Sequence, residues 1–202
     1  EGAGLPFMQR RAQQVGQKLN RIQDILKGTT AAQRKEAIEN LQAMRAPSSP
    51  LEKALVDNFK QLHKYLVEKG VKRFEPSKEK GKKGTWEPLG FIENYFPRVW
   101  DKATIREKTD EFIAALTPYI GEKQARESVA AIVNSDGSLE LAENEHSLGF
   151  TPFAAAVQNR SFDFINESNA GEFTQFMSKD LSHTLTTYVQ RAVHRAEYAS
   201  EF

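Results

Sequence analysis

The sequence contains no cysteine among its 202 residues. This absence excludes a disulfide framework, a zinc site with cysteine ligands and a thiol nucleophile. It fits synthesis in a reducing cytoplasm. Long apolar runs are also absent, because no stretch approaches the roughly 18 residues that a membrane-spanning helix needs. The sequence therefore predicts no membrane span.

The sequence also lacks an excess of either basic or acidic residues. There are 28 basic and 27 acidic residues, and the formal net charge is +1. A dedicated nucleic-acid-binding protein usually shows a clear basic excess, so that class is disfavoured. The hydrophobic fraction is 39% and the mean hydropathy is −0.59. These values favour a folded protein with an elongated shape or a large surface.

Recognisable catalytic and metal-binding motifs are missing, including G-x-S-x-G, the P-loop, G-x-G-x-x-G and H-E-x-x-H. His183 and His194 would lie roughly 16 Å apart along a helix, too far to share a metal ion. An EF-hand with Gly137 at the sixth loop position fails, because Ile132 would then be the first ligand. We therefore expect no cofactor, no metal and no enzymatic activity. An enzymatic alternative would require a composite site built by the fold or completed by a partner.

Three helices are predicted in the first 70 residues. Apolar residues recur at helical spacing over residues 6–27. Thr30 and Ser49 each begin a capping box, and Pro50 occupies the first turn after Ser49. Helices joined by such short breaks indicate a helical hairpin or small bundle.

Residues 71–87 differ in composition. The run from Lys78 to Gly84 is rich in lysine and glycine and has no apolar period. It predicts an exposed, charged linker and the boundary between two domains. A basic loop that contacts phosphate is the alternative interpretation.

Aromatic residues are concentrated just after this boundary. Tyr95, Phe96 and Trp100 surround Pro97, which prevents an uninterrupted helix. Aromatic side chains bury large areas. We therefore expect a turn or extended segment whose three aromatic residues are buried between helices and join the two halves of the chain.

The remaining sequence predicts further helices. Apolar spacing favours helices over 102–120, 122–134 and 178–202, with short helices within 151–177. The predicted fold class is all-α, with a helical hairpin or bundle (1–70), an exposed linker (71–87) and a larger irregular helical domain (88–202).

The last predicted helix has a face of small residues. Alanines at 192, 196 and 199 would allow a neighbouring helix to approach closely, with Arg191 and Arg195 at the rim. We expect this helix to dock onto a helix of this chain or of an assembly partner. It has no glycine stop signal, so a longer parent chain is expected.

Two segments resemble parts of known proteins. One reads Glu-Asn-Tyr-Phe-Pro-Arg-Val-Trp-Asp over residues 93–101, and the other runs from Asn159 to Tyr188 and into the helix beyond. They are similar to segments of large tailed-bacteriophage proteins, which include internal virion or ejection-type proteins and large polyvalent proteins that travel with phage DNA. The resemblance covers about residues 51–202.

The resemblance implies a helical structural module within a longer chain. It further implies an architectural role, in fixing helix packing, for five polar residues: Arg98, Asp101, Arg160, Asp180 and Tyr188.

These observations lead to one expected function and two alternatives. The expected function is a structural and interaction module of a phage virion protein, made in the bacterial cytoplasm and located in the particle. Its partners would be other virion proteins or other domains of the parent chain. The alternatives are an accessory helical domain of a larger phage enzyme, such as a virion polymerase, and a scaffold that contacts DNA non-specifically.

Overall fold

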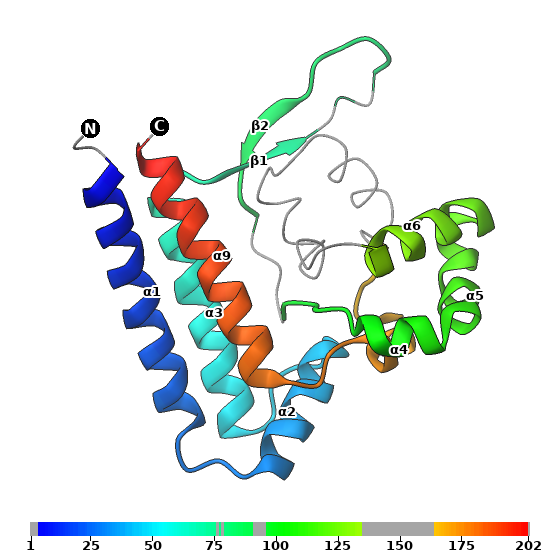
Figure 1. Ribbon diagram of the computed structural model, residues 1–202, viewed down its shortest axis with the longest axis horizontal. Coiled ribbons are helices and arrows are strands. Elements are labelled where there is room, and N and C mark those ends of the chain that lie inside the picture. The colour runs from blue at the N-terminus through cyan, green and yellow to red at the C-terminus, as the bar shows by residue number, and fades with distance from the viewer. Residues whose placement is uncertain (1–3, 76, 78, 91–95, 135–163, 202) are drawn as a thin grey trace.

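The computed structural model describes residues 4–75, 77, 79–90, 96–134 and 164–201, and most of them are helical (Figure 1). The helices are α1 (Gly4–Leu26), α2 (Ala31–Gln42), α3 (Pro50–Glu68), α4 (Lys102–Glu107), α5 (Thr109–Ile120), α6 (Glu122–Asn134) and α9 (Leu181–Glu201). Two short 3₁₀ turns, η1 (Ala170–Glu172) and η2 (Thr174–Phe176), precede α9. The predicted all-α fold class is confirmed.

Both predicted capping boxes are present. The Gln33 backbone N–H donates to the Thr30 hydroxyl at 3.1 Å, and the Thr30 N–H donates to the Gln33 side chain at 2.8 Å. Glu52 and Ser49 make the equivalent pair of bonds at 3.2 and 3.3 Å at the start of α3. Gly70, with φ of +77°, ends the segment after α3, because a left-handed conformation is accessible to glycine at little cost.

The first hydrophobic core lies among α1, α2, α3 and α9. α1 begins and α9 ends at the same end of this bundle (Figure 1). Phe59 of α3 packs edge-on against Phe96 and Tyr188, with ring centroids 5.6 and 5.5 Å apart. The buried residues from these helices include Ile22, Ile38, Leu41, Leu55, Leu62, Leu66, Leu185, Val189, Ala192, Val193 and Ala196.

The position of α9 differs from the predicted division of the chain. That division placed residues 88–202 together, whereas α9 packs against α1 and α3 of the first 70 residues. The row of apolar residues on α9 did not predict which helices it packs against, because any complementary apolar face can bury such a row.

The second core is built from α4, α5 and α6 with η1 and η2. Trp100 lies 5.2 Å from Phe112, which in turn lies 4.5 Å from Phe176, measured between ring centroids. All three are fully buried. The predicted burial of Phe96 and Trp100 is confirmed, and Pro97 is buried as well. Tyr95 lies outside the described residues.

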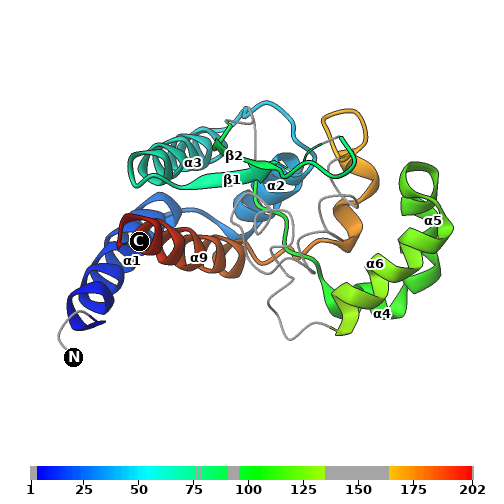
Figure 2. The ribbon, with the colours of Figure 1, turned by 90° about the horizontal axis from the view of Figure 1, so that it is seen from above.

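The segment predicted as a linker forms a β-hairpin. Strand β1 (Lys72–Glu75) pairs antiparallel with β2 (Thr85–Pro88), and Phe74 is the Cα partner of Trp86. The hairpin projects from the body beside α3 (Figures 1 and 2). The expected exposure is confirmed for β2, whose four residues are all exposed. The pairing was missed because each strand has only four residues, too few to show an alternating pattern of apolar and polar residues.

Candidate functional site

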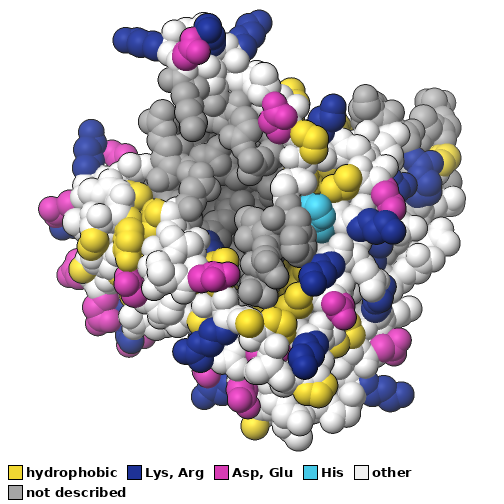
Figure 3. Space-filling view, turned by 180° about the vertical axis from the view of Figure 1, so that it is seen from behind, with side chains coloured by type: hydrophobic (Ala, Val, Ile, Leu, Met, Phe, Trp, Pro, Cys, Tyr) yellow, Lys and Arg dark blue, Asp and Glu magenta, His cyan; other side chains and the backbone are white. Residues whose placement is uncertain are grey.

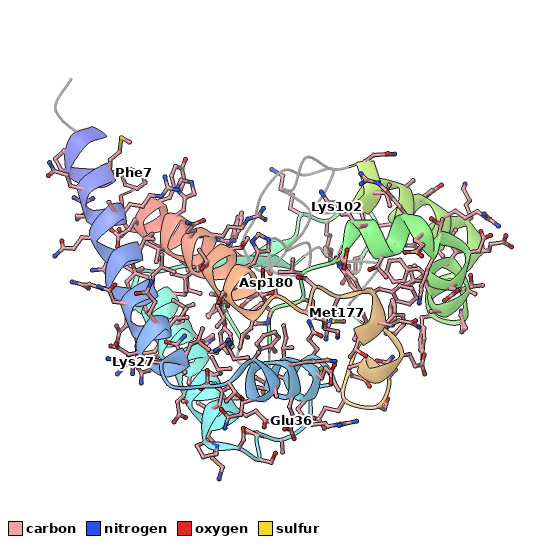
Figure 4. The ribbon with its side chains drawn as sticks, turned by 60° about the horizontal axis from the view of Figure 1, so that its bottom comes forward. Phe7, Lys27, Glu36, Lys102, Met177 and Asp180 are labelled. Atoms are coloured by element: carbon pink, nitrogen blue, oxygen red, sulfur yellow. The ribbon has the colours of Figure 1, made fainter. Side chains whose placement is uncertain are left out.

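The most concentrated set of buried polar groups lies where α1, α3 and α9 meet. Ala192 and Ala196 are completely buried in the first core, where α9 packs against α1 and α3. The small-residue face of α9 therefore docks within this chain, which is one of the two expected arrangements. Phe7, labelled in Figure 4 at the start of α1, lies beside the end of α9, and its ring is 6.3 Å from that of His194.

Glu197 is the centre of this set, which we call the Glu197 cluster. Its side chain is fully buried. The Tyr65 hydroxyl donates a 2.6 Å hydrogen bond to Glu197 Oε1, and Lys69 Nζ lies 3.1 Å from the same oxygen. Arg10 Nε lies 3.5 Å from Oε2, a charge contact longer than a good hydrogen bond. Lys18 completes the cluster with its ammonium 3.8 Å from the centroid of the Tyr65 ring.

The pKa shifts follow from burial and from these contacts. Burial alone would raise the pKa of Glu197, but the hydrogen bonds from Tyr65 and Lys69 and the positive charge of Lys69 lower it on balance. Burial raises the pKa of Tyr65, and so does the hydrogen bond to Glu197. Burial lowers the pKa of Lys18, and the charge of Arg21 acts in the same direction.

These shifts suit a structural cross-link better than proton transfer. A general acid or base works best when its pKa lies near the operating pH. The pKa of Glu197 is lowered and that of Tyr65 is raised, so the two move away from neutrality. The cluster thus holds a carboxylate ionised and a phenol protonated, and it ties α1 and α3 to α9.

Arg195 was expected at the rim of α9, and this expectation is wrong. Its side chain is 7% exposed, and Nη2 donates a 2.7 Å hydrogen bond to the Lys72 carbonyl at the start of the hairpin. Nη1 is buried and has no hydrogen-bond partner. Burial lowers the pKa of Arg195 to about 9. Arg191 is half-buried. The prediction failed because a row of apolar residues shows which face of a helix is buried. It does not show how far the packing neighbour extends around that face.

A second polar region lies between the two cores, where residues 99–101 run beside residues 176–178. Their backbones are joined by two hydrogen bonds, from Ser178 N to Val99 O at 2.7 Å and from Asp101 N to Phe176 O at 2.9 Å. Together these two bonds form an antiparallel bridge between Trp100 and Met177.

Polar side chains of these segments support the same junction. Arg98 is buried, and its Nη2 donates to the Ile165 carbonyl at 3.2 Å and contacts the Met44 sulfur at 3.3 Å. Asp101 caps α4 by accepting from the Thr104 backbone N–H at 3.2 Å.

Asp180 makes a similar cap for α9. It accepts from the His183 backbone N–H at 3.0 Å. Figure 4 shows Asp180 on the strand-like connection that follows Met177. Tyr188 is half-buried against Phe59, and burial raises the pKa of its hydroxyl. Arg160 lies outside the described residues.

Gln42 at the end of α2 completes the junction and was missed in the sequence. It is 1% exposed, and its amide nitrogen donates to the Ser178 carbonyl at 2.7 Å. Lys179 Nζ donates to the Gln42 amide oxygen at 2.5 Å and to the Thr174 carbonyl at 2.7 Å. Burial lowers the pKa of Lys179. No local signal marks Gln42, because a glutamine near a helix end is ordinarily solvent-exposed.

A surface cleft of about 310 Å³ lies between the α1–α2 turn and the start of α3. Lys27 and Glu36, both labelled in Figure 4, line it together with Glu52. Glu52 serves the capping box of α3 through Oε2, and its Oε1 is buried without a hydrogen-bond partner. Because Oε1 is closed to solvent, a ligand in the cleft would not reach it.

Within the described ranges, no group of three or more His, Asp or Glu side chains is placed to hold a metal ion. The acidic stretch at 136–145 lies outside those ranges. Among the described helices, none is long and apolar enough to cross a membrane. Comparison with known proteins found no matching family model, no matching curated protein and no matching solved structure.

Proposed function

We propose that this chain is a structural and interaction module of a tailed-bacteriophage virion protein, packaged in the particle with the genome. The observation that carries the proposal is the junction between residues 96–101 and 176–178. The two segments that resemble phage virion proteins are far apart in sequence, yet their backbones are hydrogen-bonded to one another and join two helical cores. Both resembling segments contribute to the same junction. We therefore attribute the resemblance to a shared role in holding the fold together.

The polar groups of the chain support the same interpretation. The Glu197 cluster cross-links three helices, and Arg98 and Gln42 tie the cores together through backbone carbonyls. Each of these groups is used to hold elements in place. Such a scaffold would position exposed surfaces for other virion proteins or for further domains of a parent chain.

Quantitative mass spectrometry of purified particles tests this proposal. We expect peptides of this chain at a fixed ratio to the major capsid protein. If the chain travels with the genome, its amount should fall after ejection is triggered in vitro. Absence from particles, together with abundance in infected cells, would contradict the proposal and favour an accessory domain of an intracellular phage enzyme.

A further inference from the structure

We propose that the β1–β2 hairpin, through Lys80, Lys82, Lys83 and Trp86, is a contact site for single-stranded nucleic acid. This inference concerns a surface that the virion proposal does not use, and it stands independently of that proposal. It rests on the projection of the hairpin, on the lysines of its loop and on an exposed tryptophan beside them.

The hairpin presents its loop away from the body of the molecule. β1 and β2 extend beyond the ends of the neighbouring helices in Figure 1. The projection at the top of Figure 3 carries several Lys or Arg side chains on its outer surface and an acidic one among them. The exposure of all four residues of β2 leaves this strand accessible to an extended nucleic-acid strand.

The loop places positive charge at this projection. Lys80 and Lys83 are exposed. Lys82 pairs with Glu79, but both side chains are 68% exposed. Exposed pairs of this kind contribute little free energy, so Lys82 can exchange its carboxylate for a phosphate. The net charge of +1 for the whole chain therefore conceals a local basic site.

Trp86 follows Lys83 by three residues in the same hairpin. It is 56% exposed on β2, whereas Trp100, the other tryptophan of the chain, is 1% exposed. All four residues of β2 are exposed, so the body leaves this strand open to solvent. An indole ring next to lysines is the combination that binds unpaired bases, because the ring stacks on a base while the ammonium groups contact the phosphates.

Two other polyanions fit less well. Contact with duplex DNA would use the lysines through phosphate and would give the tryptophan ring no base to stack on. A membrane surface would require several apolar side chains to enter the acyl boundary. Of the exposed residues 82, 83 and 85–88, only Trp86 and Pro88 are apolar, and Lys82, Lys83, Thr85 and Glu87 are polar or charged.

Fluorescence anisotropy with a labelled oligo-dT strand tests the proposal on the full chain. We expect binding at about 50 mM salt that weakens as salt rises. Trp86→Ala should weaken binding roughly 5- to 150-fold, the range for loss of one stacked base. Lys80→Glu with Lys83→Glu should lower the magnitude of the slope of log K against log salt by about 1.4, since two phosphate contacts are lost. Oligo-dT should also quench the exposed Trp86 emission and spare that of Trp100.

A matched variant, Lys53→Glu with Lys123→Glu, changes the net charge equally at exposed positions of α3 and α6. It should bind like the wild type. The proposal is overturned if this control loses as much affinity as the hairpin variant, or if oligo-dT is not retained at low salt. It is also overturned if duplex binds equally well and Trp86→Ala has no effect. Binding to phosphatidylglycerol vesicles without binding to oligo-dT would assign the hairpin to membranes instead.

Discussion

At the scale of single residues, the fold depends on a few buried polar groups whose partners come from distant helices. Glu197 is fully buried and ionised, and it accepts from Tyr65 and Lys69 of α3. A buried charge of this kind stabilises the fold only while its partners remain in place, because the cost of desolvation is always present. Changes at Glu197 should therefore have larger effects than changes at exposed ion pairs.

We predict that Glu197→Gln lowers the free energy of unfolding by about 2–3 kcal/mol at neutral pH, since it leaves Lys69 and Arg10 without their anion. Both cations are partly exposed, which keeps the effect moderate. Glu68→Gln is the matched control, because Glu68 pairs with Lys64 in an exposed ion pair. It should cost less than about 1 kcal/mol. If urea denaturation showed the same loss of free energy of unfolding for both variants, the Glu197 cluster would not be a stabilising cross-link.

The same carboxylate makes stability depend on pH. The pKa of Glu197 is lowered in the folded protein, so its contribution is present above the unfolded value of about 4.3 and is lost as pH falls through the lower folded value. The difference in stability between the wild type and Glu197→Gln should therefore shrink as pH falls below about 4. Denaturant melts at a series of pH values measure it, and a difference that stays constant in acid would contradict the ionised state.

Trp100 and Trp86 provide a second matched pair at the residue scale. Trp100 is 1% exposed and packs against Phe112, whereas Trp86 is 56% exposed. We predict that Trp100→Ala lowers the free energy of unfolding by about 3–5 kcal/mol. Trp86→Ala should change it by less than about 0.5 kcal/mol. A loss below about 1 kcal/mol at Trp100 would mean that the aromatic segment does not anchor the second core.

At the scale of elements, α9 is the helix that closes the first core. Its alanines allow the neighbouring helices of the first core to approach closely, and it carries both Arg195 and Glu197 into the interior. Burying a methyl group removes little apolar surface from water. The alanine face of α9 therefore contributes to stability through close packing and through the polar contacts that the close approach of the helices permits.

We predict that Ala196→Leu lowers the free energy of unfolding by about 1–3 kcal/mol, because the larger side chain overpacks the first core. Gln190→Leu introduces a leucine at an exposed position of α9 and should change the free energy of unfolding by less than about 0.5 kcal/mol. Chemical denaturation of both variants measures the difference. If the two variants lost similar free energies of unfolding, α9 would not be closely packed in the first core.

At the scale of the whole molecule, two hydrophobic cores are joined by the backbone contacts of residues 96–101 and by the Gln42 side chain. The first core contains four helices and the second contains three short ones with two 3₁₀ turns among the described residues. The smaller core buries less apolar area, so it should depend on the junction for part of its stability.

We predict that the wild type unfolds in one transition and that Gln42→Ala separates it into two. Losing the amide leaves the Ser178 carbonyl and the Lys179 ammonium without their partner, which weakens the connection between the cores. Trp100 fluorescence reports the second core, and circular dichroism reports all helices. In Gln42→Ala the fluorescence midpoint should fall below the dichroism midpoint. Coincident midpoints in the variant would show that the cores are coupled by other contacts.

The sequence by itself determined the features that depend on neighbouring residues. It determined the capping boxes at Thr30 and Ser49, the helical class and the burial of Trp100, because caps, periodicity and aromatic composition act over a few residues. It also excluded every site that needs cysteine. Local signals can predict such features without knowledge of the fold.

Only the tertiary structure decided which faces meet. It placed α9 on α1 and α3 rather than with the second half, buried Arg195 and drew Gln42 into the junction. It also turned the expected linker into a hairpin in which Trp86 is the partner of Phe74. These outcomes depend on pairing between segments far apart in the chain, and an apolar stripe or a charged run is compatible with many partners. The free energy that selects one of them comes from the whole packed core.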